Sequence, residues 1–239
     1  MTEIYSSDFV RQLFNRMSAS YERMNFITSF GFSLLWRKQF LKKVGFSYAQ
    51  VEVLDLLSGL GENWSTLIKQ FPNGNFQALD FSDSMVESSR VKSLNKLGNR
   101  FAVYKQDILE NNLSSNKFDV VTCAFGLKTF NEKQIEFFAV TLKRILKVDG
   151  KFSFIEVSKP TNKLLLIFYR LYLKHCIPFL GKLFLGNPND YKMLWLYTDK
   201  FENSKKVKEI FEKQGLIVEF DSYFFGCATG INGKKNGCT

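Results

Sequence analysis

The chain has 239 residues and a formal net charge of +10 at pH 7. This length allows one sizeable domain with a buried core, and the positive charge favours an anionic surface or an acidic partner. The four cysteines are scattered without a Cys-x-x-Cys pair and there is one histidine, so a disulfide framework and a metal site are both disfavoured. We therefore expect a single cytoplasmic domain without a metal.

The N-terminal segment is expected to be helical. Acids and arginines interrupt its apolar pattern, which excludes a signal peptide. Apolar residues recur at helical spacing from Asp8 to Met17, and a second helix is predicted from Ser33 to about Lys43.

The stretch over 51–61 organises the rest of the chain. An apolar strand is followed by Gly59 and Gly61, and a helix pattern begins near Trp64. Strand, glycine turn and helix in this order bring backbone close to a nucleotide-like ligand. A pyrophosphate fits poorly, because the turn lacks a third glycine and Glu62 stands at the helix start, which counts against a NAD-dependent dehydrogenase. An adenosyl ligand with a positive sulfonium fits better.

The second predicted strand, over 75–79, ends at Asp80. An acid at this position, about twenty residues beyond the glycine turn, can accept hydrogen bonds from both ribose hydroxyls. The alternative is that Asp80 caps the helix that begins near Ser84, although Ser82 and Asp83 can also cap it.

The remaining pattern predicts an α/β fold. A third strand over 101–104 precedes Asp107, which is placed to meet the adenine amino group, and a fourth over 118–124 leads to Phe125-Gly126-Leu127. Further helices are expected over 64–70, 83–95, 132–146 and 203–214, and further strands over 151–157, 216–220 and 223–227. These elements predict a Rossmann-like, doubly wound, mainly parallel seven-stranded sheet with helices on both faces and an antiparallel C-terminal strand pair.

A separate apolar segment extends from Lys163 to Leu185 and is rimmed by bases. It is not expected to span a membrane, because Arg170, Lys174 and Pro178 interrupt it. It fits a helix lying in an anionic membrane interface, a lid over an apolar pocket, or a buried insertion helix.

From about Val10 to about Lys235 the chain resembles the class I S-adenosylmethionine-dependent C-methyltransferases of ubiquinone and menaquinone biosynthesis. The most specific shared pieces are Tyr21-Glu22-Arg23-Met24-Asn25, Phe125-Gly126-Leu127 and Glu156-Val157-Ser158-Lys159-Pro160. The resemblance implies one methyltransferase domain over 1–239, with 1–45 as an N-terminal helical cap and 160–200 as a helical substrate-lid insertion.

The resemblance also implies the cofactor, the substrate and the site. S-adenosylmethionine would donate a methyl group to a carbon of a prenylated quinol, either demethylmenaquinol-like or a ubiquinol precursor. The catalytic candidates are Lys128 and Tyr21, and the substrate-binding candidates are Asn25, Phe125, Tyr169 and Tyr191. The cofactor-binding candidates are Asp55, Gly59, Leu60, Gly61, Asp80, Phe81, Met85, Asp107, Ile108 and Ala124.

This chain departs from the family pattern at several positions. Lys128-Thr129 replaces an arginine and an asparagine, which keeps the positive charge but loses the planar guanidinium fork. We expect Lys128 to stabilise a substrate oxyanion or to act as its base, against the alternative of a solvated loop lysine. Tyr21 would lie near the reacting methyl group, against the alternative of a packing aromatic. Other departures are Ser58, Leu60, Glu62, Ala124 and the run Met193-Leu194-Trp195-Leu196-Tyr197.

Other functions stay open from the sequence alone. The acceptor could be another lipophilic molecule, transfer could be to oxygen or nitrogen, and a non-catalytic member could scaffold a quinone-biosynthesis complex. Nucleic acid is not an expected partner, because no proline follows the fourth strand in Ala124-Phe125-Gly126-Leu127 and the lysines are spread along the chain. The expected partners are a prenyl quinol and an anionic membrane surface, with peripheral attachment, and a homodimer is compatible with the sequence.

Overall fold

The computed structural model describes residues 3–183 and 187–237, and they contain one seven-stranded sheet. Its strands are β1 (Glu52–Leu56), β2 (Asn75–Asp80), β3 (Phe101–Lys105), β4 (Phe118–Ala124), β5 (Leu146–Val157), β6 (Leu216–Tyr223) and β7 (Ala228–Lys235). The order is β3-β2-β1-β4-β5-β7-β6, and β7 runs antiparallel to both of its neighbours. The predicted fold class is confirmed.

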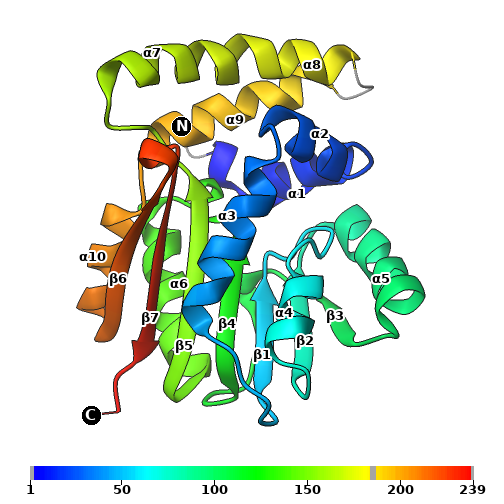
Figure 1. Cartoon of the computed structure of the whole chain (residues 1–239), viewed down its shortest axis with the longest axis vertical. Coiled ribbons are helices and arrows are strands. Elements are labelled where there is room, and N and C mark those ends of the chain that lie inside the picture. The colour runs from blue at the N-terminus through cyan, green and yellow to red at the C-terminus, as the bar shows by residue number, and fades with distance from the viewer. Residues whose placement is uncertain (1–2, 184–186, 238–239) are drawn as a thin grey trace.

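Helices cover both faces of this sheet (Figure 1). On one face lie α3 (Phe32–Leu41) and α4 (Trp64–Gln70), with α5 (Asp83–Leu97) beside β3; on the other lie α6 (Glu132–Ile145) and α10 (Lys205–Lys213). Each face has its own apolar core, centred on Phe40 and Trp64 in front and on Phe138 and Phe211 behind. The order reverses between β1 and β4, which opens a crevice at their carboxyl ends.

Helix α6 illustrates how the local sequence sets these elements. Asn131 and Gln134 form a reciprocal capping box at its start, which satisfies two backbone N–H groups that have no partner within the helix. Ile135, Phe138 and Leu142 recur at helical spacing and are buried against the sheet. The end of α6 leads directly into β5.

A second group of helices lies over the carboxyl ends of the parallel strands, at the top of Figure 1. These helices are α1 (Ser7–Met17), α2 (Tyr21–Thr28), α7 (Lys163–Leu171), a π-helical turn (Tyr172–Cys176), α8 (Ile177–Leu183) and α9 (Pro188–Phe201). We call them the helical cap. Short 3-10 turns occur at Glu3–Tyr5, Lys42–Val44, Ile108–Glu110, Leu127–Thr129 and Phe224–Gly226.

The structure corrects the expected C-terminal elements. The closing strand is β7, not 223–227, whereas the helix α9 (Pro188–Phe201) falls almost entirely within the segment 160–200 that was expected to be helical. Gly230 and Gly233 weaken the strand pattern of β7, yet the packing requires them: a Cβ atom would lie 2.5 Å from the Phe154 carbonyl oxygen at the first and 1.9 Å from the Ile217 carbonyl oxygen at the second.

The apolar segment forms one continuous helix from Lys163 to Leu183. By length and composition alone, its 21 residues would suffice to cross a membrane, so the charges and proline do not exclude this as the sequence suggested. In the folded chain, Leu173 and Ile177 on its inner side are buried in the helical cap against Tyr191. Because the Ile177 N–H bonds back to the Tyr172 carbonyl oxygen, the helix widens just before Pro178, which has no N–H.

Candidate active site

Two cavities meet where the helical cap covers the carboxyl ends of the strands. The larger, of about 220 Å³, lies under α7 and α9, and the smaller lies at the ends of β1, β2 and β4. Phe14, Tyr21, Phe125 and Thr129 line both cavities. A group held in the smaller cavity therefore lies next to a molecule held in the larger one.

The glycine turn and the end of β2 form one wall of the smaller cavity. One oxygen of Asp80 accepts the backbone N–H of Gly59 at 2.8 Å, and the other accepts the N–H of Ser82 at 2.9 Å. Burial raises the pKa of Asp80, and the same N–H groups oppose that rise. Each carboxylate oxygen has a second lone pair, so Asp80 can still accept hydrogen bonds from a ligand.

The charge of the smaller cavity selects the kind of ligand. Glu62, Asp80 and Asp107 line it, and among the residues of the structure described as lining it there is no lysine, arginine or histidine. Glu62 is paired with Arg37 at 3.1 Å, whereas Asp80 and Asp107 form no ion pair with a described residue. These carboxylates would repel a pyrophosphate but attract a sulfonium and an ammonium group. The donors and acceptors present therefore fit an adenosyl group with a cationic tail and fit a dinucleotide poorly.

Six of the ten predicted cofactor residues line the smaller cavity: Gly59, Asp80, Phe81, Met85, Asp107 and Ala124. The other four, Asp55, Leu60, Gly61 and Ile108, do not line it, and their assignment to the cofactor stays a prediction. Ile108 is fully buried in the apolar core. Leu60 is nearly buried, and its carbonyl oxygen accepts a hydrogen bond from Lys92. Gly61 has φ +70°, and a Cβ there would lie 2.5 Å from the Trp64 ring. Asp55 lies behind the turn, fully buried.

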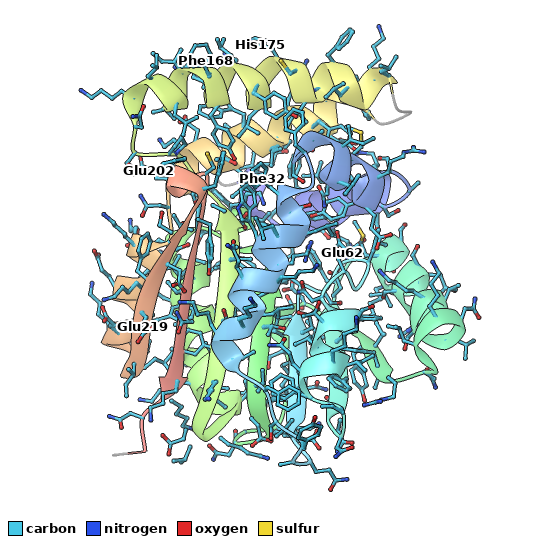
Figure 2. The ribbon with its side chains drawn as sticks, viewed as in Figure 1. Phe32, Glu62, Phe168, His175, Glu202 and Glu219 are labelled. Atoms are coloured by element: carbon cyan, nitrogen blue, oxygen red, sulfur yellow. The ribbon has the colours of Figure 1, made fainter. Side chains whose placement is uncertain are left out.

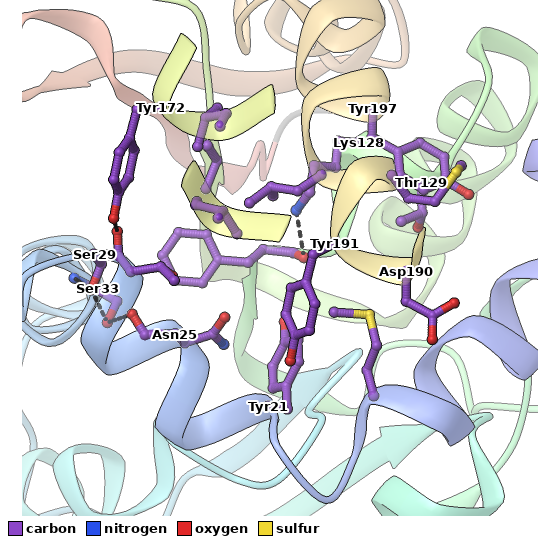
Figure 3. A pocket seen from close by; sticks show the side chains of 18 of the residues that line it. Tyr21, Asn25, Ser29, Ser33, Lys128, Thr129, Tyr172, Asp190, Tyr191 and Tyr197 are labelled. Atoms are coloured by element: carbon purple, nitrogen blue, oxygen red, sulfur yellow. Dashed lines mark hydrogen bonds between the residues drawn. The ribbon is translucent and has the colours of Figure 1, made fainter. Parts of the chain in front are cut away.

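The predicted catalytic and substrate residues all line the larger cavity: Tyr21, Asn25, Phe125, Lys128, Tyr169 and Tyr191. Figure 3 shows several of them around the shared space. Tyr191 is held by a 2.7 Å hydrogen bond between its hydroxyl and that of Ser20, and the Tyr169 hydroxyl donates to the Cys227 carbonyl at 3.2 Å. The rest of the lining is mainly aromatic and aliphatic, which suits an apolar ligand.

Tyr21 lies at the junction of the two cavities. Its ring meets that of Phe14 edge to face at a centroid distance of 6.0 Å. Burial, and after it the charge of Glu62, raises the pKa of Tyr21 well above its usual value. Tyr21 therefore stays a neutral phenol near pH 7, which can exchange hydrogen bonds but is not available as a phenolate base.

Lys128 is not a solvated loop lysine. Its ammonium group is buried and lies 2.7 Å from Oε1 of Glu156, which is completely buried at the end of β5. It also donates to the Phe125 carbonyl oxygen at 3.1 Å, a bond drawn in Figure 3. Glu156 accepts two backbone N–H groups in addition, from Lys128 and Val157. Two of the three ammonium protons are thus used, and the third is free to meet a ligand in the cavity.

Comparison with known proteins assigns this arrangement to a family. The model of the ubiE/COQ5 methyltransferase family matches residues 1–235. The chain belongs to this family. A demethylmenaquinone methyltransferase of Lactococcus lactis subsp. lactis (strain IL1403) is 30% identical over 229 residues, covering 93% of this chain and 88% of the relative. One of Staphylococcus aureus (strain JH9) is 31% identical over 232 residues, covering 95% and 92%.

The solved structures agree with the fold. A SAM dependent methyltransferase from Aquifex aeolicus superposes with a TM-score of 0.58 at 22% identity, over 83% of this chain and 89% of that one. The resemblance stated from the sequence is therefore confirmed, and so is the enzyme class: the chain is an S-adenosylmethionine-dependent methyltransferase.

In this methyltransferase Asp55 supports the glycine turn from behind. Its carboxylate accepts hydrogen bonds from Asn63 at 3.1 Å, from the Trp64 indole at 3.1 Å and from Thr122 at 2.7 Å. Asn63 in turn accepts from Arg37, whose guanidinium lies 3.1 Å from Glu62. This buried network fixes the turn from behind and reaches the smaller cavity at Glu62.

Asp55 gives the methyltransferase a predictable pH dependence. Burial raises the pKa of Asp55 to about 6, against an ordinary value of 3.8. Between these values the folded state binds more protons than the unfolded state, so this carboxyl lowers stability as the pH rises. The free energy of unfolding of the wild type, minus that of Asp55→Asn, should fall by on the order of 3 kcal/mol from pH 4 to pH 7. Denaturant titrations at several pH values measure this difference, and a flat difference would contradict the raised pKa.

Some functional residues were not predicted from the sequence. Arg16 binds Asp190 with two nitrogens, at 2.8 and 3.1 Å, and so joins α1 to α9 over the larger cavity. These two residues lie 174 positions apart, and neither has a local pattern that reveals the pair. Glu156 stands in a motif that the sequence does reveal, but its pairing with Lys128 follows only from the register of β4 and β5.

Proposed function

We propose that this methyltransferase transfers a methyl group to a ring carbon of a prenylated quinol of the demethylmenaquinol type. The observation that carries the proposal is the junction of an acidic cavity with a larger apolar one at Tyr21, Phe125 and Thr129. The names of the relatives, demethylmenaquinone methyltransferases at about 30% identity over most of both chains, support it. A ubiquinol precursor, or another lipophilic acceptor, would use the same junction.

S-adenosylmethionine, when bound, supplies a methyl group that is already strongly electrophilic. The chain therefore has mainly to align the acceptor and to keep water out. In the proposal, Gly59, Asp80 and Asp107 hold the adenosyl part and Glu62 faces the cationic part. The helical cap closes the site over both ligands and excludes water.

Lys128 would activate the acceptor. A quinol becomes nucleophilic at a ring carbon when a ring hydroxyl loses its proton, which would be released to solvent. As the methyl–carbon bond formed, the methyl–sulfur bond would break, and the proton of the methylated ring carbon would then restore the hydroxyl, so that one proton is released overall. The third N–H of the Lys128 ammonium would donate to this oxygen and stabilise its developing negative charge. A role as the base is less well supported, because loss of the lysine proton would leave the buried Glu156 carboxylate without its partner.

Tyr21 and Asn25 would position the acceptor. The side chains of both residues line the larger cavity. As a neutral phenol, Tyr21 would present its hydroxyl or its ring edge to the acceptor beside the junction. Tyr169, Tyr191 and Phe125 would hold the acceptor by apolar contact.

The sequence alone also left open a non-catalytic member that scaffolds a biosynthetic complex, which the family assignment disfavours. Two features favour an enzyme, since a scaffold would need neither. They are the carboxylates that line the smaller cavity and the N–H of the Lys128 ammonium group that is available to a ligand. For localisation we propose a cytoplasmic enzyme attached to the membrane surface. A homodimer is compatible with this arrangement.

The test is to incubate the purified protein with methyl-labelled S-adenosylmethionine and a total lipid extract, and to identify the labelled product by mass and by the position of the label. The expected product is a quinol labelled at a ring carbon. A labelled phospholipid would contradict the proposed acceptor, and a labelled methyl ether would contradict transfer to carbon. If the protein binds the cofactor but yields no labelled product, the result would favour a scaffold.

A further inference from the structure

One side of the helix from Lys163 to Leu183 is apolar, and no described residue packs over it. Figure 2 shows Phe168 and His175 at the outer side of this helix, away from the sheet. The exposed apolar residues of the helix are Leu164, Ile167, Phe168, Leu171, Phe179 and Leu183. We call them the outer face. So many large apolar side chains together on one surface indicate a binding site and not chance exposure.

The charges on the helix that carries the outer face have one sign. The segment 163–183 contains Lys163, Arg170, Lys174 and Lys182 and has neither aspartate nor glutamate in its sequence. The guanidinium of Arg170 lies 5.8 Å from the ring centre of Trp195, which places the charge at the side of the helix. An apolar helix face flanked by bases complements a surface of acyl chains and anionic headgroups.

The larger cavity opens beside this helix. Among the described residues that line the cavity, Phe30 alone is exposed, with 78% of its surface accessible, and we infer from this exposure that the mouth lies at Phe30. The Phe30 ring stacks on Tyr172 of the same helix at a centroid distance of 5.7 Å, and the Tyr172 hydroxyl donates to the Thr28 carbonyl oxygen at 2.8 Å. The mouth is thus framed by the α2–α3 turn and by the helix that carries the outer face.

We propose that the outer face lies in the headgroup layer of an anionic bilayer, parallel to its surface, and that a lipid-tailed acceptor passes from the bilayer into the cavity beside the stacked rings of Phe30 and Tyr172. The passage of the acceptor rests on the proposed function, whereas the docking of the helix does not. The helix lies on the bilayer and does not cross it, because Leu173 and Ile177 on its other side belong to the helical cap.

Vesicle flotation tests the docking. The wild type should float with vesicles of phosphatidylcholine and phosphatidylglycerol at three to one, should bind pure phosphatidylcholine at least tenfold more weakly, and should be released by 1 M salt, where charges are screened within about 3 Å. The variant Leu164→Glu/Phe168→Glu should lose at least tenfold in binding to the anionic vesicles. Binding unchanged by this double substitution would overturn the proposal.

The chain offers a matched control. Leu94 on α5 and Phe46 before β1 are 64% and 55% exposed, close to the 65% of Leu164 and the 63% of Phe168, and neither belongs to the helix that carries the outer face. Leu94→Glu/Phe46→Glu should bind vesicles like the wild type, and equal losses in both variants would overturn the proposal. Sedimentation velocity tests a dimer contact in place of membrane docking. If the wild type is a dimer that does not bind vesicles, and Leu164→Glu/Phe168→Glu is a monomer while Leu94→Glu/Phe46→Glu is a dimer, the outer face contacts a second copy and the proposal is wrong.

Activity assays separate this proposal from the proposed function. With a soluble, short-tailed hydroquinone, Leu164→Glu/Phe168→Glu should turn over like the wild type, and with a long-tailed quinol in anionic vesicles it should be at least tenfold slower. Equal rates on the long-tailed quinol would overturn the passage from the bilayer. If the wild type methylates neither acceptor, the proposed function fails, while the flotation result still decides the docking.

Discussion

Asp80→Ala should weaken the binding of S-adenosylmethionine about a hundredfold and reduce kcat/KM by a similar factor. The substitution removes a carboxylate that is placed to accept hydrogen bonds from a ribose, and each hydrogen bond to a charged group contributes about 1.5–3 kcal/mol. It also releases the Gly59 and Ser82 N–H groups that now bond to Asp80. Titration calorimetry measures the affinity, and thermal unfolding shows whether the fold is kept.

Two comparisons sharpen this test. Asp119 accepts the backbone N–H of Glu52 at 2.8 Å, much as Asp80 accepts that of Gly59, but it lies near the opposite end of the sheet. Asp119→Ala should therefore leave the cofactor affinity unchanged. S-adenosylhomocysteine that lacks one ribose hydroxyl should bind the wild type more weakly than intact S-adenosylhomocysteine does. The variant Asp80→Ala should bind these two ligands with the same affinity. If removing the ribose hydroxyl weakens binding to the wild type and to Asp80→Ala by the same factor, Asp80 acts only by fixing the glycine turn.

Lys128→Met should lower kcat at saturating cofactor by about a hundredfold or more, because it removes the ammonium donor from the larger cavity. The affinity for S-adenosylmethionine should stay within about twofold of the wild type, since Lys128 does not line the smaller cavity. The substitution also leaves Glu156 buried without its partner, which costs about 3–5 kcal/mol of stability. Stopped assays with the quinol, and chemical denaturation, measure the two effects separately.

A second variant distinguishes catalysis from stability. Lys128→Met/Glu156→Gln removes both charges, so it should recover most of the lost stability but none of the lost activity. Lys128→Arg keeps a cation in the cavity and should retain measurable turnover. Turnover at the wild-type level in the double variant would show that Lys128 serves only to neutralise Glu156.

The elements of the sheet could be predicted because their sequences carry strong local signals. The helix Trp64–Gln70 and the strand Phe118–Ala124 begin and end where the sequence indicated. The strand β7 carries no such signal, because two of its residues are glycines selected by the close approach of neighbouring carbonyl groups. The local sequence pattern thus fails to predict an element where packing between distant segments determines which residue type fits.

The site could be predicted in part for the same reason. Asp80 and Asp107 follow predicted strands, and parallel strands bring their carboxyl ends to one edge of the sheet. Lys128 could be singled out as a departure from the family pattern, but its burial and its pairing with Glu156 depend on the arrangement of β4, β5 and the helical cap. Asp55 was expected at the cofactor, whereas its three hydrogen bonds within the protein show it behind the turn.

The most direct test of the central claim is a crystal structure with S-adenosylhomocysteine. We predict that the ribose hydroxyls bond to Asp80, that the sulfur lies at the junction between Tyr21 and Phe125, and that the larger cavity stays open beside it. An adenosyl group bound elsewhere, or no ligand bound at a saturating concentration, would contradict the account.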